Sequence, residues 1–415
     1  MQIARRFEAP NAILEMVGRF DAQGADEALQ AIESVTSELR GDLILDLEHL
    51  DYLSSAGVRV LLVAQGIMEA HSGRLRIVNV RPFVRRVLEL CRITHLIEDG
   101  DEVVLRVWGA RGSFPTPIAP DTVEAKIAAA LARAKPKDLA TADRFVKTLP
   151  PTQRGTVGGN TACVELRLAD RLFILDAGTG IHGLGIELMK GAFGKGKGSA
   201  FLLLSHRHRD HIMGLPFFAP AYVPGNRFEV CGGHADLMDA LREQQRPEFF
   251  PVPLDDMGAE FTCHRLIEGE DNPLAGIRVD VLRMDHPGDS FGYRLEYADR
   301  AIVYATDVEI KEFNPKALKR YIEFFATADI LILDGQYSLQ ESVAKADWGH
   351  TSPLIGAELA AEAKVKQLLL FHHDPQATDE QLEESLDTTR DYLRHTAPES
   401  DCAIDLAREG LEITL

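Results

Sequence analysis

The sequence has no long apolar run and no paired cysteine motif. Hydrophobic residues make up 45% of its 415 residues, but no stretch approaches the ~20 continuous apolar residues of a membrane-spanning helix. The N-terminus, MQIARRFEAP, continues into polar and charged residues, which argues against a secretory signal. The 5 cysteines form no CxxC pair and fit reduced thiols. These absences predict a soluble, cytoplasmic protein that does not contact a membrane.

Positive charge is also scarce. The 45 Lys and Arg residues face 64 Asp and Glu residues, which gives a formal net charge of −19 at pH 7. Proteins bind nucleic acids largely by neutralising phosphates with Lys and Arg, so this balance makes RNA and DNA unlikely partners and favours a small substrate. The sequence has no nucleophile elbow and no Cys-His signature, so we expect chemistry that needs no protein nucleophile.

The length of the chain fits two domains better than one. Residues 1–100 alternate short apolar runs with amphipathic helical segments, which predicts a small α/β sheet domain. The acidic, turn-forming LIEDGDEVV marks a boundary near Gly100, and residues 101–415 form the second domain. An Ala-rich segment at about 120–150 has Pro and Gly at its edges. It predicts an inserted helical element, a candidate flap or a contact in a homodimer.

The most specific motif is FLLLSHRHRDHIMGLPFF. An apolar strand runs into a loop that carries His206, His208, Asp210 and His211 within six residues. Folding alone does not require such a density of imidazole and carboxylate. Imidazole suits Zn, Fe and Mn, and a carboxylate adds charge and can bridge two ions. The loop therefore predicts a metal site at the end of a strand.

Three later segments offer further ligands at strand ends. His286 lies in the turn of LRMDHPGDSFGYRLEY, Asp307 ends the strand of AIVYATDVEI, and KQLLLFHHDP ends in His372 and His373. Taken singly, each is weak, because an Asp after a strand is more often a turn or cap residue. Together they complete two coordination spheres.

A further histidine precedes a predicted helix. In WGHTSPLIGAELAAEA, His350 comes before Ser352 as N-cap and Pro353 at the first helical position. The histidine then lies at the positive end of the helix, where an anionic phosphate is stabilised. We expect His350 to be a general acid or charge stabiliser, and Asp334, at the end of another strand, to orient it. The alternatives are a surface histidine and a turn aspartate.

The ordered ligand set HxHxDH, later His, strand-end Asp and final His resembles that of the metallo-β-lactamase superfamily. The branch it resembles contains phosphodiesterases and tRNA 3′-processing endonucleases, and the resemblance covers roughly residues 103–415. It implies a four-layer αββα sandwich. It also implies one metal at His206, His208 and His286, another at Asp210, His211 and His372, and Asp307 as a bridge. His373 is the alternative to His372.

Other segments fit the same family. VWGARGSFPTP, VGGNTACVEL and FILDAGTGIHGLG resemble the opening hairpins of cyclic-nucleotide-phosphodiesterase-like members. We expect Asp176, in the last of these, to orient the HxHxDH loop and not to bind metal. His350 also resembles the histidine that contacts the scissile phosphate in the endonuclease branch.

The resemblance implies two divalent metal ions, zinc by expectation, with manganese or iron as alternatives. Two such ions roughly 3.5 to 4 Å apart can share a hydroxide and clamp the attacking and leaving oxygens of a phosphodiester. We therefore expect a dinuclear phosphodiesterase for a small phosphodiester such as a cyclic nucleotide. Its expected catalytic residues are Asp210, Asp334 and His350.

Residues 1–100 resemble the STAS domain of anti-sigma-factor antagonists. The resemblance lies in GRFDAQGADEALQ, LILDLEHLDYLSSAGVRVLL and NVRPFVRRVLELCRITHLI. It implies a regulatory or docking domain with a signalling role, in which a partner kinase phosphorylates Ser55. Phosphorylation adds ~2 negative charges at a helix N-terminus and can switch partner binding. Ser54 stands where the family usually has aspartate, and the alternative is that Ser54 and Ser55 only cap the helix.

Three other functions share the ligand set. A nuclease of tRNA-processing type is disfavoured by the acidic charge. A non-hydrolytic regulator could sense a ligand at a di-iron site and relay its state through the STAS domain. A lactamase-type hydrolase is the third alternative.

Overall fold

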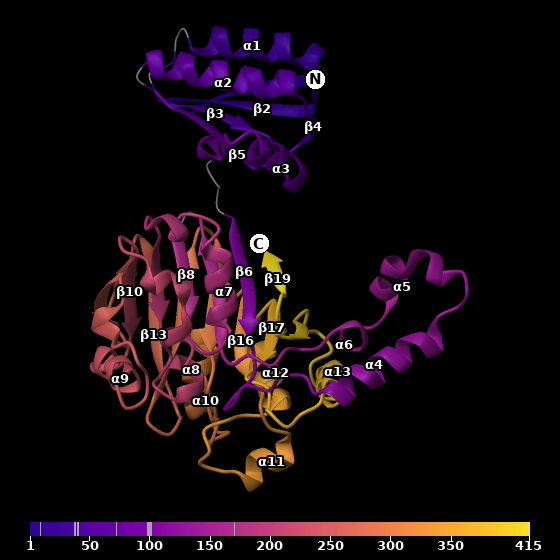
Figure 1. Cartoon of the computed structure of the whole chain (residues 1–415), viewed down its shortest axis with the longest axis vertical. Coiled ribbons are helices and arrows are strands. Elements are labelled where there is room, and N and C mark those ends of the chain that lie inside the picture. The colour runs from indigo at the N-terminus through magenta and orange to yellow at the C-terminus, as the bar shows by residue number, and fades with distance from the viewer. Residues whose placement is uncertain (9, 37–38, 40, 72, 98–101, 170) are drawn as a thin grey trace. The chain divides into compact units, whose positions relative to one another are not determined.

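The computed structural model describes residues 1–415 except 9, 37–38, 40, 72, 98–101 and 170 (Figure 1). Contacts divide the chain into two compact units, Met1–Glu102 and Val103–Leu415. The boundary expected at Gly100 lies outside the described residues. Within the described parts of the chain, no helix combines the length and apolarity needed to cross a membrane.

The first unit is a small sheet covered by helices. Its strands run in the order β1 (Gln2–Glu8), β2 (Asn11–Phe20), β3 (Leu43–Asp46) and β5 (Leu75–Val78), with β4 (Leu50–Leu53) paired to β2. Its helices are α1 (Ala22–Thr36), α2 (Ser55–Ala70) and α3 (Pro82–Leu90). Helices α1 and α2 lie side by side over the sheet (Figure 1). Helix α1 buries Ala25, Ala28, Ile32 and Val35, the 3.6-residue spacing of a core-facing stripe.

The second unit contains two larger sheets. The first has the order β11 (Glu260–Arg265), β10 (Arg227–Gly232), β9 (Ser199–Leu203), β8 (Arg171–Leu175), β7 (Cys163–Leu168), β6 (Val103–Gly109) and β19 (Glu412–Thr414). The second has the order β12 (Asn272–Leu274), β13 (Ile277–Met284), β14 (Ser290–Tyr297), β15 (Arg300–Ala305), β16 (Ile330–Asp334), β17 (Gln367–Phe371) and β18 (Ala403–Leu406).

The two sheets share the central core. Leu166, Phe173, Tyr293 and Phe371 are among the buried side chains that pack there. On the outside of the first sheet lie α7 (Ile181–Leu188) and α9 (Leu237–Gln244), and on the outside of the second lie α10 (Pro315–Phe325), α12 (Pro353–Glu362) and α13 (Asp379–Thr396). All residues of β16 are buried, as expected for a parallel strand covered on both faces. The α/β class and the αββα sandwich predicted from the sequence are confirmed.

Parallel strand pairs bring the polar strand-end residues together. Strand β8 is parallel to β9, and β15, β16 and β17 are parallel to one another. Their carboxyl ends therefore lie at common sheet edges. Within two residues of the ends of β8, β15 and β17, Asp176, Asp307 and His372 adopt left-handed φ angles of 59°, 51° and 57°. This conformation is uncommon for residues other than glycine and often marks functional sites.

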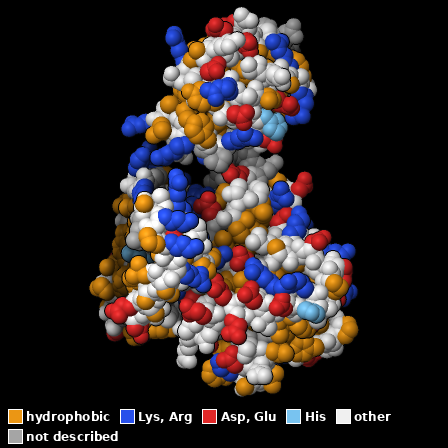
Figure 2. All heavy atoms as spheres, turned by 90° about the vertical axis from the view of Figure 1, so that its right-hand side faces the viewer, with side chains coloured by type: hydrophobic (Ala, Val, Ile, Leu, Met, Phe, Trp, Pro, Cys, Tyr) orange, Lys and Arg blue, Asp and Glu red, His pale blue; other side chains and the backbone are white. Residues whose placement is uncertain are grey.

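An arm of short helices interrupts the second unit between β6 and β7. It consists of α4 (Pro120–Arg133), a 3₁₀ turn (Asp138–Thr141), α5 (Ala142–Thr148) and α6 (Pro151–Arg154). No residue of α4 is buried. Lys126 ties the arm to the body, because its ammonium lies 2.9 Å from the buried carboxylate of Asp379. Figure 2 looks onto the side that carries this arm, where hydrophobic and charged side chains are intermixed at the surface.

Candidate metal centre

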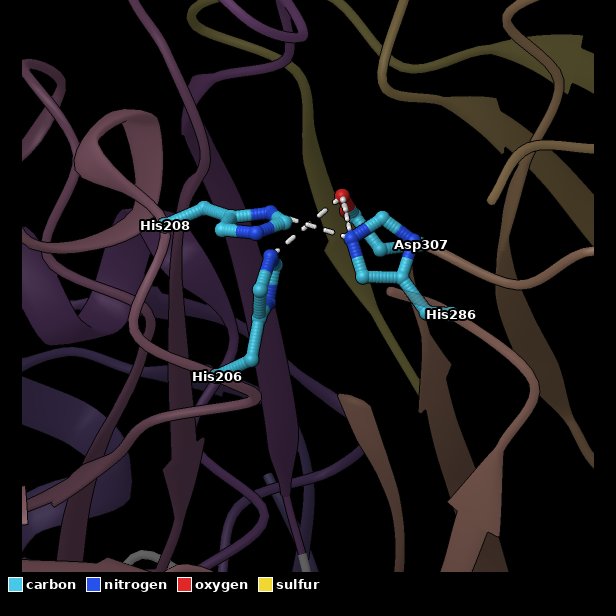
Figure 3. A group of neighbouring side chains, drawn as sticks. All are labelled: His206, His208, His286 and Asp307. Atoms are coloured by element: carbon cyan, nitrogen blue, oxygen red, sulfur yellow. Dashed lines mark hydrogen bonds and ion pairs between the residues drawn. The ribbon is translucent and has the colours of Figure 1, made fainter. Parts of the chain in front are cut away.

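The predicted ligands converge in two groups. In the first, donor atoms of His206, His208, His286 and Asp307 all lie within 4.8 Å of one another (Figure 3). In the second, donor atoms of Asp210, His211 and His372 do the same. The residues come from four separate stretches of the chain. The HxHxDH loop follows β9 and runs into the short helix α8 (Arg209–Ile212), with His208 as its N-cap.

Asp307 lies between the two groups. Its Oδ2 is 3.5 Å from His206 Nε2 and 3.6 Å from His286 Nε2. Its Oδ1 is 3.2 Å from both His211 Nε2 and His372 Nε2. One carboxylate thus presents a different oxygen to each set of imidazoles, which is the arrangement of a bridging ligand.

Hydrogen-bond acceptors behind the rings fix the histidine tautomers. The Nδ1 atoms donate as follows: His211 to Asp176 Oδ2 at 2.7 Å, His372 to Gln336 Oε1 at 3.0 Å, and His286 to the Gly349 carbonyl at 2.8 Å. Because these oxygens accept, the proton of each neutral ring sits on Nδ1 and the Nε2 lone pair points inward. The Nε2 atoms of His211 and His372 lie only 3.2 Å apart. Either a proton shared between them or a metal ion beside them would relieve the repulsion between their lone pairs.

His206 has an unsatisfied nitrogen. Ser205 Oγ donates to Asp176 Oδ2 at 2.7 Å, so it accepts from His206 Nδ1 at 3.0 Å. His206 Nε2 is buried and, among the described residues, makes no hydrogen bond. Leaving a buried polar atom unsatisfied costs about 1–3 kcal/mol. This atom points at Asp307 and fits coordination to a metal ion.

Electrostatics also favour a cation in the site. Burial opposes a charge on His211, but Asp307, Asp210 and Asp176 outweigh it and hold the pKa of His211 well above its usual range. The buried carboxylates therefore need a positive charge beside them, from a proton or from a metal. Burial lowers the pKa of His206 well below its usual range, and the neighbouring His211 adds to this effect. His206 is thus a neutral imidazole, the form that binds metal.

The donor set fits two divalent ions. It contains imidazole nitrogens and carboxylate oxygens, which suit Zn, Mn and Fe. The first group with Asp307 would hold one ion, and the second group with Asp307 would hold the other. We therefore retain the ligand assignment predicted from the sequence.

His350 and Asp334 form a buried pair next to this cluster. His350 Nδ1 donates to Asp334 Oδ2 at 2.7 Å. Burial opposes a charge on His350, but Asp334 outweighs it and raises the pKa of His350 to about 9. The His350 ring stacks on that of His372, with centroids 4.9 Å apart. Ser352 is the N-cap of α12, as expected, so His350 lies just before the positive end of this helix.

The structure separates the paired histidines after β17. His372 faces the cluster, and a Cβ on Gly112 would lie 2.4 Å from its Nδ1, so only glycine fits at position 112. His373 faces away and its Nε2 donates to the Ala407 carbonyl at 2.8 Å. Burial lowers the pKa of His373 to about 4. The geometry thus favours His372 as the ligand.

Some residues that support the site carry no clear signal in the sequence. Ser113 donates its backbone N–H to Asp210 Oδ2 at 2.7 Å. Glu309 accepts the N–H groups of Asp347 and Gly349. Gln336, which orients His372, is different, because a polar residue just after a buried strand end is a recognisable signal.

Asp176 has the orienting role expected for it. It is fully buried and accepts hydrogen bonds from Ser205 N, Ser205 Oγ, His211 Nδ1 and Tyr304 OH, each at 2.7 Å. An amide at this position would turn an NH2 group toward some of these donors. We expect Asp176→Asn to weaken metal binding about 10–100-fold, as measured by titration against a competing chelator.

A matched control for this variant is Asp329→Asn. Asp329 is also buried and accepts from Lys366 Nζ at 2.7 Å and Ala301 N at 2.8 Å. It precedes β16, whose other end carries Asp334, about 16 Å away along the strand. Asp329→Asn should lower stability without changing metal affinity. Equal metal affinities for Asp176→Asn and the parent protein would contradict the orienting role.

Ser55 lies at the start of α2 in the first unit and is exposed. Its neighbour Ser54 is the N-cap, accepts from Gly57 N at 3.3 Å and donates to the Phe20 carbonyl at 3.1 Å. The cap therefore belongs to Ser54, which leaves the Ser55 hydroxyl accessible. Phosphorylation of Ser55 stays a prediction.

Comparisons with known proteins bear on both units. The family model described as "Beta-lactamase superfamily domain" matches residues 171–373, and the model described as "Mlab, STAS domain" matches residues 3–98. An uncharacterized protein of Mycobacterium leprae is 26% identical over 207 residues, which are 49% of this chain and 67% of that protein. This chain therefore spans about two thirds of the length of that relative.

Two other proteins extend the comparison. A ribonuclease Z of Acaryochloris marina is 24% identical over 267 residues, which are 52% of this chain and 81% of that protein. The crystal structure of the metallo-β-lactamase fold protein YhfI from Bacillus subtilis matches with a TM-score of 0.50 and 16% identity. That match covers 76% of this chain and all of YhfI. The protein therefore contains an N-terminal STAS domain, matched at residues 3–98, and a β-lactamase-superfamily domain, matched at residues 171–373, within a unit that has the metallo-β-lactamase fold.

Proposed function

We propose that the protein is a dinuclear metal-dependent phosphodiesterase that hydrolyses a small phosphodiester, with a cyclic nucleotide as the first candidate. The observation that carries this proposal is Asp307, whose two oxygens face two separate sets of histidines. Two metal ions bound there, zinc by expectation, would activate water and neutralise the charge of a phosphodiester. The net charge of −19 supports a small substrate over a polynucleotide.

His350 and Asp334 complete the proposed catalytic residues. Asp334 accepts from Nδ1 and so keeps the other ring nitrogen, Nε2, directed at the cluster, where it can donate to a substrate oxygen. His350 would protonate the leaving oxygen or stabilise the charge that develops on the phosphate. The N-terminus of α12, close to His350 in the chain, adds a positive electrostatic potential for the anionic group. Asp210 would bind one of the metal ions, and its carboxylate would balance part of the positive charge of that ion.

The direct test is an assay of purified protein with its metals quantified. We expect about two equivalents of divalent metal per chain and hydrolysis of bis(p-nitrophenyl) phosphate and then of a cyclic mononucleotide. A chelator should abolish the activity, and added Zn or Mn should restore it. Protein that is fully loaded with metal and hydrolyses no phosphodiester would refute the proposal. Redox-active iron in such a protein would favour a non-hydrolytic sensor.

A second candidate is a nuclease of tRNA-processing type, because some relatives are ribonuclease Z proteins. Phosphate contacts make such binding strongly dependent on salt concentration. Cleavage of tRNA precursors that falls steeply between 50 and 200 mM salt, as about 6–10 phosphate contacts would produce, would favour this function. Hydrolysis of cyclic mononucleotides, measured over the same range of salt concentration, would instead favour the small-molecule phosphodiesterase.

The STAS domain would serve as a regulatory or docking module for a protein partner or kinase, with Ser55 as the modified residue. Its exposed hydroxyl at the start of α2 supports this role. A phosphate there would meet free backbone N–H groups of the helix. The exposed face of α4 is the candidate contact for a homodimer.

A further inference from the structure

An exposed tryptophan lies close to the His350 and Asp334 pair. Trp348 is 62% exposed, although a side chain of this size is usually largely buried. It precedes His350 by two residues, so their Cα atoms are at most about 7 Å apart. The segment that carries it includes α11 (Leu339–Ala344), which lies at the lower end of the second unit in Figure 1. At the same height, Figure 2 shows hydrophobic side chains at the surface.

The backbone on both sides of Trp348 is held in place. Asp347 N and Gly349 N donate to the two carboxylate oxygens of Glu309, at 2.8 and 3.0 Å. Glu309 is itself buried. The Gly349 carbonyl accepts from His286 Nδ1, and with φ at +89° a Cβ on Gly349 would lie 2.1 Å from that nitrogen. Trp348 is therefore anchored to a predicted metal ligand, and its exposure does not come from a loose loop.

A row of side chains connects Trp348 to His350. The His350 ring lies edge to face with that of Tyr337, with centroids 5.4 Å apart. Lys345 Nζ lies 4.0 Å from the centroid of the Tyr337 ring and 6.0 Å from that of Trp348. Lys345 also accepts the backbone N–H of Trp348 at its carbonyl, at 3.1 Å. The Trp348 side chain thus has Lys345 at the outer range of a cation–π contact and remains mostly exposed to solvent.

We infer that Trp348 stacks the base of a nucleoside phosphodiester whose phosphate binds at the metal centre. This inference rests on the proposed function and names the substrate class. A rigidly held, exposed indole provides a flat surface for any base, because every base has a π face. Because Trp348 is two residues from His350 in the chain and is linked to it through Lys345 and Tyr337, a base stacked on the indole would be within reach of a phosphate bound near His350. A phosphodiester without an aromatic group would gain nothing from it.

Fluorescence tests the inference without hydrolysis, because the chain has only two tryptophans. The other, Trp108, donates its indole N–H to Glu165. In a Trp108→Phe background loaded with metal, Trp348 is the only indole. Adenosine 5′-monophosphate should quench it saturably, whereas ribose 5-phosphate should not. Quenching of equal size by both ligands, or by neither, would overturn the inference.

Kinetics provide the second measurement. Trp348→Leu should lower kcat/KM for a cyclic mononucleotide about tenfold and leave that for glycerol cyclic phosphate, which has no base, unchanged. Leu131→Ala, on the arm, is the control, because Leu131 is also 62% exposed. If Trp348→Leu lowers kcat/KM equally for both substrates, the inference that Trp348 stacks the base is overturned, but the proposed phosphodiesterase activity is not. If adenosine 5′-monophosphate alone quenches Trp348 and the protein hydrolyses no phosphodiester, the proposed function is refuted, whereas stacking of a base on Trp348 is supported.

Discussion

Asp307→Ala should remove both metal ions and nearly all hydrolysis. Each oxygen of this carboxylate faces a different set of histidines, so its loss affects both proposed metal sites at once. Loss of an outer partner of a ligand weakens metal binding by about 10–100-fold, and a shared direct ligand should have a larger effect. We therefore expect metal content well below one equivalent per chain after dialysis, and activity at least about 100-fold below the parent.

We expect Asp307→Ala to lose activity because it loses metal, and not because it unfolds. Asp307 sits at a strand end with φ at +51°, so alanine adds some backbone strain. Asp307→Asn keeps the shape and one carbonyl oxygen, and should retain part of the metal. Asp329→Ala is the matched control, because Asp329 is also a buried carboxylate and lies just before β16 of the same sheet. This variant should keep its metal and activity but unfold more easily. Two full equivalents of metal in Asp307→Ala would contradict the bridging role.

His350→Ala should keep the metal ions and lose rate. The ring belongs to the buried pair with Asp334 and lies beside the cluster, so its removal takes away a donor without removing a predicted ligand. General acid catalysis contributes about 10²–10⁴-fold, and we expect kcat to fall by that factor. Metal analysis and steady-state kinetics on the same sample measure both effects.

The pair should act as a unit. Asp334→Asn leaves an amide beside His350 Nδ1 and should also lower kcat. The variant that combines Asp334→Asn with His350→Ala should have a kcat little below that of His350→Ala alone. His373→Gln is the control, because this buried histidine faces away from the site and glutamine can still donate to the Ala407 carbonyl. His350→Ala that hydrolyses at the parent rate, or that loses metal, would show that its role is different.

The expected ligands could be read from the sequence because metal binding depends on side-chain chemistry. Imidazoles and carboxylates bunched after an apolar strand have few other uses, and each later donor also followed or preceded an apolar run. Parallel strands bring such ends to one edge of a sheet, so strand-end position predicts that Asp307 and His372 lie near each other. His206 follows a strand of the other sheet, so its meeting with them depends on how the two sheets pack. The α/β class of both units was predicted in the same way, from short apolar runs alternating with helical periods.

Other features of the site required the tertiary structure. The structure favours His372 over His373 because His372 Nε2 lies 3.1 Å from Asp210 and 3.2 Å from Asp307, whereas His373 Nε2 donates to the Ala407 carbonyl. The contacts that hold Trp348 use the backbone N–H groups of Asp347 and Gly349. Every residue except proline has such an N–H, so the sequence carries no sign of where these bonds form.

By itself, therefore, the sequence determined which groups are available to hold cations and that they stand at strand ends, and it predicted two α/β parts. Only the tertiary structure decided how these groups are directed. Asp307 presents one oxygen to each set of histidines, and Asp176 orients His211 directly and His206 through Ser205. Backbone N–H groups on either side of Trp348 hold its segment in place. The physical reason is that donor chemistry belongs to single residues, whereas direction depends on φ angles and backbone hydrogen bonds between distant segments.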